Sequence, residues 1–256
     1  VADDSEVLEQ VVLQLYGRGV HPAPEILLPA ALPEPAAVAE LLTEGAGRTI
    51  RCRVPRRGAK VKLIEMAAEN ARVRHAAAGE ERRLVERATV ELKRRLHLHV
   101  LPRRIECFDI SHLGGTDTVA SMVVLEDGKP LKKAYRSFTI RAAGSSDDYG
   151  AMAEVMARRL ARVDKGWTLP DLLVVDGGKG QLGVAIAAAT EAGLDVPLAG
   201  LAKPDAGELE RDPDATDKVF LPGRKNPVRL LPHSPGLHML QRVRDEAHRF
   251  AIGLQR

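Results

Sequence analysis

The sequence is poor in aromatic residues and in cysteine. Its 256 residues include one Trp, three Tyr and four Phe. A protein that holds single-stranded nucleic acid by stacking bases on rings needs more rings on one surface, so that class of protein is excluded. Two cysteines, Cys52 and Cys107, provide neither a disulfide framework nor a four-ligand zinc site.

Long apolar runs are also missing. None approaches the ~20 residues that cross a bilayer, and no signal-peptide pattern is present. We therefore expect a cytoplasmic protein with no membrane partner. There is no Gly-x-Ser-x-Gly elbow, which argues against a serine hydrolase. The first residue is Val1 rather than Met, so we expect a piece of a longer protein.

The net charge of +3 is distributed unevenly along the chain. Residues 1–50 carry −6, residues 51–104 carry +10, residues 105–210 carry −5 and residues 211–256 carry +4. Two basic blocks around an acidic one fit a metal-dependent nuclease, with carboxylates at the centre and phosphate-binding rims. Solvated helix faces produce similar runs, so charge alone leaves both interpretations open.

Residues 1–95 are predicted to form a small α/β domain. The apolar spacing predicts helices and short strands, and no catalytic residue types cluster here. Gly79 is a point where the third helix could break or kink. The expected helices span 5–16, 35–44 and 60–96, and the expected strands span 25–28 and 48–54.

Residues 96–256 are predicted to form a second α/β domain with a mixed sheet flanked by helices. A meander of three strands comes first, with a hairpin turn at Asp127-Gly128. Ser234 is the expected N-cap of the last helix. The expected strands span 104–111, 118–126, 131–140, 171–175 and 197–202, and a short hairpin joins 217–221 to 228–231. The expected helices span 148–163, 179–192 and 234–254. Turns or loops are expected over 112–117 and 203–216.

Two carboxylates stand out in the predicted strands. Asp109 lies between apolar neighbours, where a buried carboxylate is costly unless it is paired or binds a cation. Asp176 ends a buried strand, where loops of α/β sheets open into ligand sites. If the two strands are neighbours, the two carboxylates face each other and provide hard oxygen ligands for Mg²⁺ or Mn²⁺. Taken singly, either residue also fits a capping or turn role.

Further candidates lie on the predicted helices. Asp147 and Asp148 begin one helix, where they fit N-capping or a third carboxylate for the metal. His248 shares a helix face with Arg244 and Asp245 and points towards the protein body, as a structural residue or a ligand. Three other histidines compete for that role: His112, His233 and His238.

The glycine-rich segment 177–181 does not form a P-loop. Leu173 stands where the motif needs Gly, and Gly180 stands where it needs Ser or Thr. Lys179 still opens a helix beside Asp176, where it could contact a phosphate. The predicted DNA-phosphate contacts are Lys179, Arg224, Lys225 and Arg229.

Six blocks of the sequence resemble the UvrC family of bacterial excinucleases. They are FDISH (108–112), TVAS (118–121), DDYGAM (147–152), VVDGGKGQ (174–181), VFLPGR (219–224) and RDEAHRFA (244–251). The resemblance covers about residues 100–256, and residues 1–95 look like the segment just upstream. It implies an RNase H-like endonuclease that makes the 5′ incision in bacterial nucleotide excision repair, within the SOS response, on damaged double-stranded DNA presented by UvrB.

Each functional residue of the family can be matched to a position in this sequence. The resemblance implies that Asp109, Asp176 and His248 are catalytic and hold Mg²⁺ or Mn²⁺, and that Asp148 supports activity. Residues 1–95 would then be an inactive RNase H-like domain. The family's Gly-Ile-Tyr nuclease and tandem helix-hairpin-helix modules are not in this sequence. The alternatives are a non-catalytic DNA-binding scaffold of the same repair complex, or another RNase H-like nuclease such as a transposase or resolvase.

Overall fold

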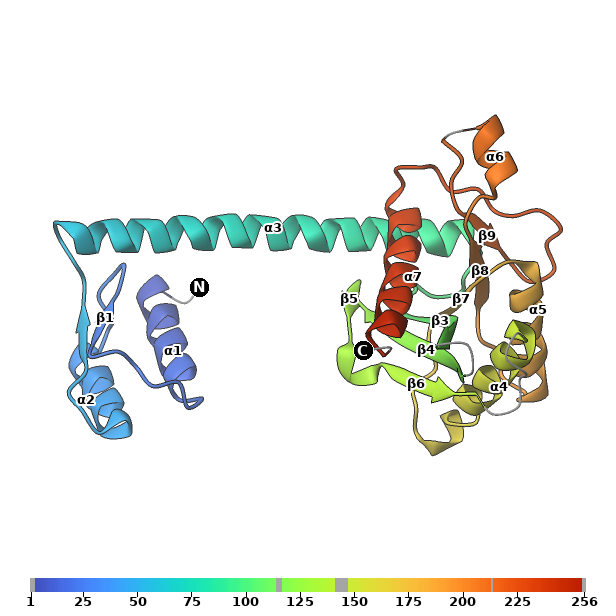
Figure 1. The fold of residues 1–256 in the computed structure, drawn as a ribbon. Helices are drawn as coiled ribbons and strands as arrows, with labels where there is room; N and C mark the ends of the chain where they lie inside the picture. The colour runs from blue at the N-terminus through green and yellow to red at the C-terminus, as the bar shows by residue number, and fades with distance from the viewer. Residues whose placement is uncertain (1–2, 114–116, 141–146, 213, 255–256) are drawn as a thin grey trace. The chain divides into compact units, whose positions relative to one another are not determined.

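The computed structural model in Figure 1 describes residues 3–113, 117–140, 147–212 and 214–254. The chain divides into two compact units, Val1–Gly79 and Glu80–Arg256, and each is described by itself. Among the described residues, no helix combines the length and the apolar character that crossing a membrane requires.

The first unit is a small α/β arrangement, as predicted. Helix α1 (Asp4–Tyr16) precedes strand β1 (Glu25–Leu27), and helix α2 (Pro35–Ala46) precedes strand β2 (Arg51–Arg53). The two strands pair in parallel, so the intervening helix is a crossover connection. Apolar side chains from all of these elements and their loops form one core: Val12, Ile26, Leu28, Leu32, Val38, Leu42 and Ile50, with Cys52 packed against it.

Helix α3 (Ala59–Arg95) is continuous, so the expectation that Gly79 could break it is wrong. Glycine costs about 1 kcal/mol relative to alanine inside a helix, which the many flanking helix-forming residues outweigh. The two compact units meet between Gly79 and Glu80, inside this helix. The domain boundary between residues 95 and 96, at the end of the same helix, stays a prediction.

The second unit contains a seven-stranded mixed sheet. Its order is β5-β4-β3-β7-β8-β9, and β6 also pairs with β4. Strands β3, β7 and β8 run parallel, while β4, β5, β6 and β9 join by antiparallel pairing. The strands are β3 (Arg104–Leu113), β4 (Asp117–Glu126), β5 (Lys129–Pro130), β6 (Arg136–Thr139), β7 (Leu172–Asp176), β8 (Leu198–Ala202) and β9 (Lys218–Phe220).

Helices cover both faces of this sheet. The end of α3 and helix α7 (Pro235–Gly253) pack on one face, and helices α4 (Asp148–Leu160) and α5 (Lys179–Glu191) pack on the other (Figure 1). Side chains alternate along a strand, so Cys107 faces α7 and Phe108 faces α4. Strand β7 is buried on both faces, which explains its continuous apolar run.

Two predicted elements differ from the structure. The single strand expected over 131–140 is wrong: β5 ends at Pro130, and a 3₁₀ turn (Lys132–Ala134) separates it from β6. Proline lacks the N–H that would continue the ladder. The polar loop expected over 203–216 contains helix α6 (Ala206–Arg211), whose capping box joins Asp205 and Glu208. Residues 114–116 of the predicted 112–117 turn lie outside the described residues.

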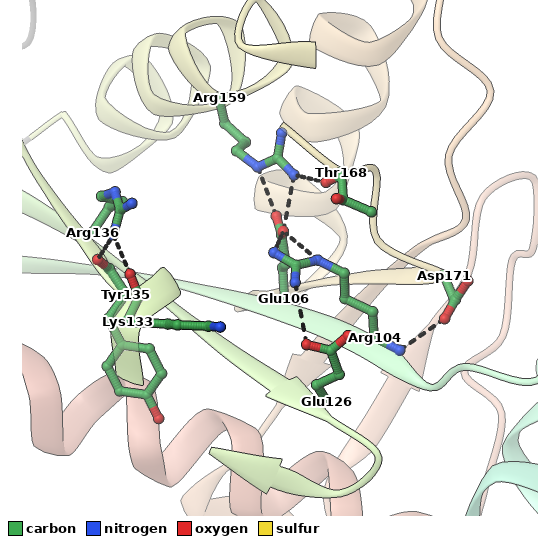
Figure 2. A network of polar contacts seen from close by, with 9 residues as sticks. All are labelled: Arg104, Glu106, Glu126, Lys133, Tyr135, Arg136, Arg159, Thr168 and Asp171. Atoms are coloured by element: carbon green, nitrogen blue, oxygen red, sulfur yellow. Dashed lines mark hydrogen bonds and ion pairs between the residues drawn. The ribbon is translucent and has the colours of Figure 1, made fainter. Parts of the chain in front are cut away.

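A buried ion pair ties α4 to the sheet (Figure 2). Glu106 on β3 is fully buried, and both of its oxygens accept hydrogen bonds from Arg159, at 2.7 and 2.9 Å. Arg159 also donates to the Thr168 carbonyl at 2.7 Å, and Arg104 donates to Glu106 at 3.0 Å. This carboxylate is therefore neutralised by arginines, and alternation puts it on the face of the sheet opposite Asp109.

Candidate metal centre

The strand register brings Asp109 and Asp176 together. Phe108 on β3 pairs with Val175 on β7, and each aspartate is the next residue along its strand. Cys107 and Val174, which lie two residues before the aspartates on their strands, belong to the core beneath α7, so both aspartates point to the α7 face. The condition in the sequence-based inference, that the two strands are neighbours, is met.

Helix α7 adds His248 to this pair. The buried hydroxyl of Ser121, which lies opposite Asp109 in the β3–β4 register, donates to the Ala247 carbonyl at 3.1 Å. The next side chain on the helix is His248, whose Nδ1 lies 3.6 Å from Oδ2 of Asp109. One ligand atom from each of Asp109, Asp176 and His248 lies within 4.8 Å of the others.

The two aspartates share an unfavourable electrostatic environment. Burial raises the pKa of Asp109, and a hydrogen bond from the Ser111 hydroxyl at 2.9 Å partly offsets this. Burial, together with the neighbouring charge of Asp109, raises the pKa of Asp176 to about 6. Unlike Glu106, this pair has no arginine bound directly to it among the described residues, so a bound cation would stabilise the two charges as arginine stabilises Glu106.

A divalent ion fits this group of donors. Mg²⁺ and Mn²⁺ prefer carboxylate oxygens at about 2.1 Å, so ligand atoms on one ion lie roughly 3–4 Å apart. The three candidate ligand atoms lie within 4.8 Å of one another, close to that spacing. Asp109 and Asp176 would hold the ion from the sheet, and His248 would hold it from α7.

Asp148 stands beside this group of three rather than within it. It is the first residue of α4, and Asp147 is the N-cap, whose carboxylate accepts from the Gly150 amide at 2.9 Å. The capping interpretation is therefore right for Asp147. The Asp148 charge raises the pKa of Asp109, which places it within electrostatic reach of the metal ligands. Gly180 on α5 leaves room for Tyr149, since a Cβ there would lie 2.4 Å from its hydroxyl.

The predicted DNA-contacting cations gather near the start of α5. The Lys179 ammonium donates to the Lys225 carbonyl and lies 5.9 Å from the centre of the Phe220 ring. Arg224, Lys225 and Arg229 line one hollow on the loop that follows β9. Lys179 thus joins the glycine loop after Asp176 to these three residues.

The sequence analysis did not identify a second polar network beneath α7. Arg244, on the turn before His248, forms a buried ion pair with Asp217 at 2.8 Å, and Gln241 donates to the same carboxylate at 2.8 Å. The Arg244 charge also lowers the pKa of Asp176, against the effect of burial. Arg244 lies four residues before His248, but nothing local in the sequence indicates Asp217 as its partner.

Two of the three competing histidines do not join the site. His233 and His238 are exposed and belong to no group of potential ligands among the described residues. The side chain of His112 lies outside the described residues.

A mixed sheet with helices on both faces, and a pair of aspartates with a histidine across its central strands, defines an RNase H-like endonuclease domain. Residues 93–252 match the family model described as the UvrC RNase H endonuclease domain, and residues 1–78 match that of the UvrC ribonuclease H-like domain. The chain belongs to the UvrC family.

Curated relatives agree with this assignment over nearly the whole chain. The UvrABC system protein C of Syntrophotalea carbinolica is 44% identical over 259 residues, which cover 98% of this chain and 42% of the relative. That of Gloeobacter violaceus is 43% identical over 263 residues, covering 99% of this chain and 40% of the relative. The chain therefore spans about two fifths of the length of these relatives.

Solved structures show a more distant likeness. A Ciona intestinalis endonuclease V, in complex with DNA containing an inosine, is 12% identical over 60% of this chain and 85% of that chain, with a TM-score of 0.38. The endonuclease V of Streptomyces avermitilis is 17% identical over 65% of this chain and 89% of that chain, with a TM-score of 0.37.

Proposed function

We propose that the second unit is a Mg²⁺- or Mn²⁺-dependent DNA endonuclease that makes the 5′ incision in bacterial nucleotide excision repair. The observation that carries this proposal is the convergence of Asp109, Asp176 and His248 from three separate elements. Family membership supports the repair role, and the exposed cations near Lys179 suit a phosphate backbone.

The residues of the site have distinct tasks in this mechanism. A bound divalent ion lowers the pKa of a water molecule and neutralises charge on the scissile phosphate. Asp109 and Asp176 would hold and orient that ion from the sheet. The His248 side chain is 61% exposed, so it reaches the substrate from the solvent side, as a ligand or by moving a proton. Asp148 supports the site from the first turn of α4.

The wider setting is proposed on the same grounds. The substrate is damaged double-stranded DNA, presented by UvrB in the cytoplasm as part of the SOS response. Lys179, Arg224, Lys225 and Arg229 contact phosphates of that DNA. Relatives named UvrABC system protein C support these partners.

Incision of damaged DNA by the full-length protein with UvrB and Mn²⁺ tests the catalytic assignment. Asp109→Asn and Asp176→Asn are expected to lower the 5′ incision rate at least hundredfold, because each removes a metal ligand. Asp195→Asn removes an exposed carboxylate between α5 and β8 and is expected to cut at the parent rate. Parent-like cutting by either ligand variant would reject the assignment.

The scaffold alternative is better suited to the first unit. Within residues 3–79, no group of three potential metal ligands is found. Calorimetry separates the two functions, since a nuclease site requires Mn²⁺ binding that is lost in Asp109→Asn. Absence of such binding in the unsubstituted chain would favour the scaffold for both units.

A further inference from the structure

A strongly basic hollow is lined by the end of α3 and by the loop between β9 and α7. Its volume is about 810 Å³, and no carboxylate lines it. Five cationic side chains do: Arg94, Arg95, Arg224, Lys225 and Arg229. Among the described residues, none of the five forms an ion pair with a carboxylate.

Both walls of the hollow are anchored in the core. On the α3 side, Leu92 and Leu96 are buried in the core beneath α7. The loop side is held by Leu221 and Leu230, which flank it and are 8% and 2% exposed. The Val228 amide also donates to the Val219 carbonyl at 2.7 Å, closing the base of the loop.

A direct contact joins the two walls. The Arg95 guanidinium donates to the Arg229 carbonyl at 3.0 Å, so the last turn of α3 holds the loop in place. His97, which follows the helix, has a left-handed backbone (φ 57°) and also lines the hollow. Pre-organised walls lower the entropic cost of binding a ligand.

Five like charges in one anchored hollow repel each other, and an anion relieves that repulsion. The dipole at the end of α3 accounts for Arg94 and Arg95, since cations are favourable near a helix C-terminus. It does not account for the three cations on the loop. Among the described residues, the exposed carboxylates of Asp212 and Asp214 line an adjacent hollow, but neither forms an ion pair with these three cations.

One side chain connects this hollow to the metal centre. Lys179 follows Asp176 by three residues, and its ammonium donates to the carbonyl of Lys225, a lining residue. A polyanionic strand whose scissile phosphate lies at Asp176 therefore has a cationic route across Lys179 into the hollow.

We propose that this hollow binds backbone phosphates of the DNA at a distance from the cut, and that α3 contributes two of its five cations. This inference rests on the proposed function for its ligand. Phosphate contacts carry no sequence information, so the hollow anchors any DNA sequence and sets the position of the strand over the metal centre.

The test measures binding of a short fluorescent DNA duplex to the 256-residue chain by anisotropy, in EDTA and over a range of salt. The variant Arg94→Gln/Arg224→Gln removes one exposed cation from each wall. The control Arg82→Gln/Arg87→Gln removes the same charge from exposed positions earlier on α3. The hollow variant is expected to bind roughly tenfold more weakly at low salt, with the log–log salt slope reduced by about 2.

Three outcomes overturn the proposal: equal weakening in the control, parent-like binding by the hollow variant, or no binding of DNA by the unsubstituted chain. Two duplexes of unrelated sequence should be affected equally, and a large difference between them also counts against a phosphate anchor. Failure of the proposed nuclease function can be told apart from failure of this proposal. In that case the chain binds no Mn²⁺, but the hollow variant still binds DNA more weakly than the control variant.

Discussion

Two carboxylates on β3 show how differently the same chemical group can be used. Glu106 and Asp109 are both buried, and alternation sends them to opposite faces of the sheet. Arg159 binds Glu106 with two hydrogen bonds, which stabilises the packing of α4. Among the described residues, the polar contacts of Asp109 are a serine hydroxyl and a histidine, with no arginine. The residue left without a strong partner is the one placed to bind a cation.

Asp176 is expected to destabilise the metal-free protein. Its pKa is about 6 in the folded chain against 3.8 ordinarily, so the folded state binds the proton more tightly. The free energy of unfolding therefore falls as the pH rises from about 4 to about 6, and the loss persists above that range. Asp176→Asn removes the effect, so in EDTA at pH 7.5 the variant should be roughly 1–2 kcal/mol more stable.

Urea unfolding with and without Mn²⁺ checks this prediction. The parent should gain stability from Mn²⁺, because the ion binds only the folded state, and Asp176→Asn should gain little. Asp195→Asn is the control, since its carboxylate is exposed, and it should behave as the parent. A variant less stable than the parent in EDTA would contradict the argument.

Among the elements, α7 determines where His248 lies. Ser121 holds the helix near its C-terminal end, and Asp217 holds the preceding turn through Arg244 and Gln241. Both anchors come from the second unit's sheet or the segment entering β9. A histidine on an exposed helix surface is thereby kept within reach of the buried Asp109 and the half-buried Asp176.

Loss of the Asp217 anchor should weaken the metal site. Asp217→Asn leaves Arg244 buried with a weaker partner, which should lower the free energy of unfolding by about 2–4 kcal/mol. A looser α7 should also reduce Mn²⁺ affinity measured by calorimetry, under conditions where the variant is folded. Asp214→Asn, an exposed change three residues earlier, should alter neither quantity. Full Mn²⁺ affinity in the folded Asp217→Asn variant would show that the anchor does not position His248.

At the scale of the whole molecule, every proposed metal ligand and phosphate contact belongs to Glu80–Arg256. Helix α3 starts in the first unit, yet its only buried residues are Ala88, Thr89 and Leu92. Cutting the helix near Gly79 therefore exposes little apolar surface.

A fragment of residues 80–256 should fold and keep the metal centre. We expect its Mn²⁺ affinity to lie within about threefold of the parent chain, since each unit has its own core. Circular dichroism reports folding, and calorimetry reports Mn²⁺ binding. The fragment 3–79 is the control and should bind no Mn²⁺. A folded 80–256 fragment without Mn²⁺ binding would mean that the first unit completes the site.

The fold class was predictable because the elements that local sequence patterns indicate are present in the tertiary structure. The apolar run of β7, the Asp127-Gly128 turn with both φ angles positive, and the Ser234 N-cap were each predicted from a few neighbouring residues. The failures were also local: a 3₁₀ turn at Lys132–Ala134 replaces the start of the strand predicted over 131–140, Gly79 does not interrupt a helix, and the capping box of α6 was overlooked.

The sequence by itself determined which residues are chemically suited to a metal, because a carboxylate in an apolar strand, or at the end of one, is costly without a partner. Only the tertiary structure decided which of them meet. The pairing of β3 with β7 joins Asp109 to Asp176, and α7 adds His248 from more than seventy positions further along the chain. Likewise, only folding brought Asp217 to Arg244 and the end of α3 to the basic loop. Such contacts depend on strand order and helix docking, which no local pattern of residues specifies.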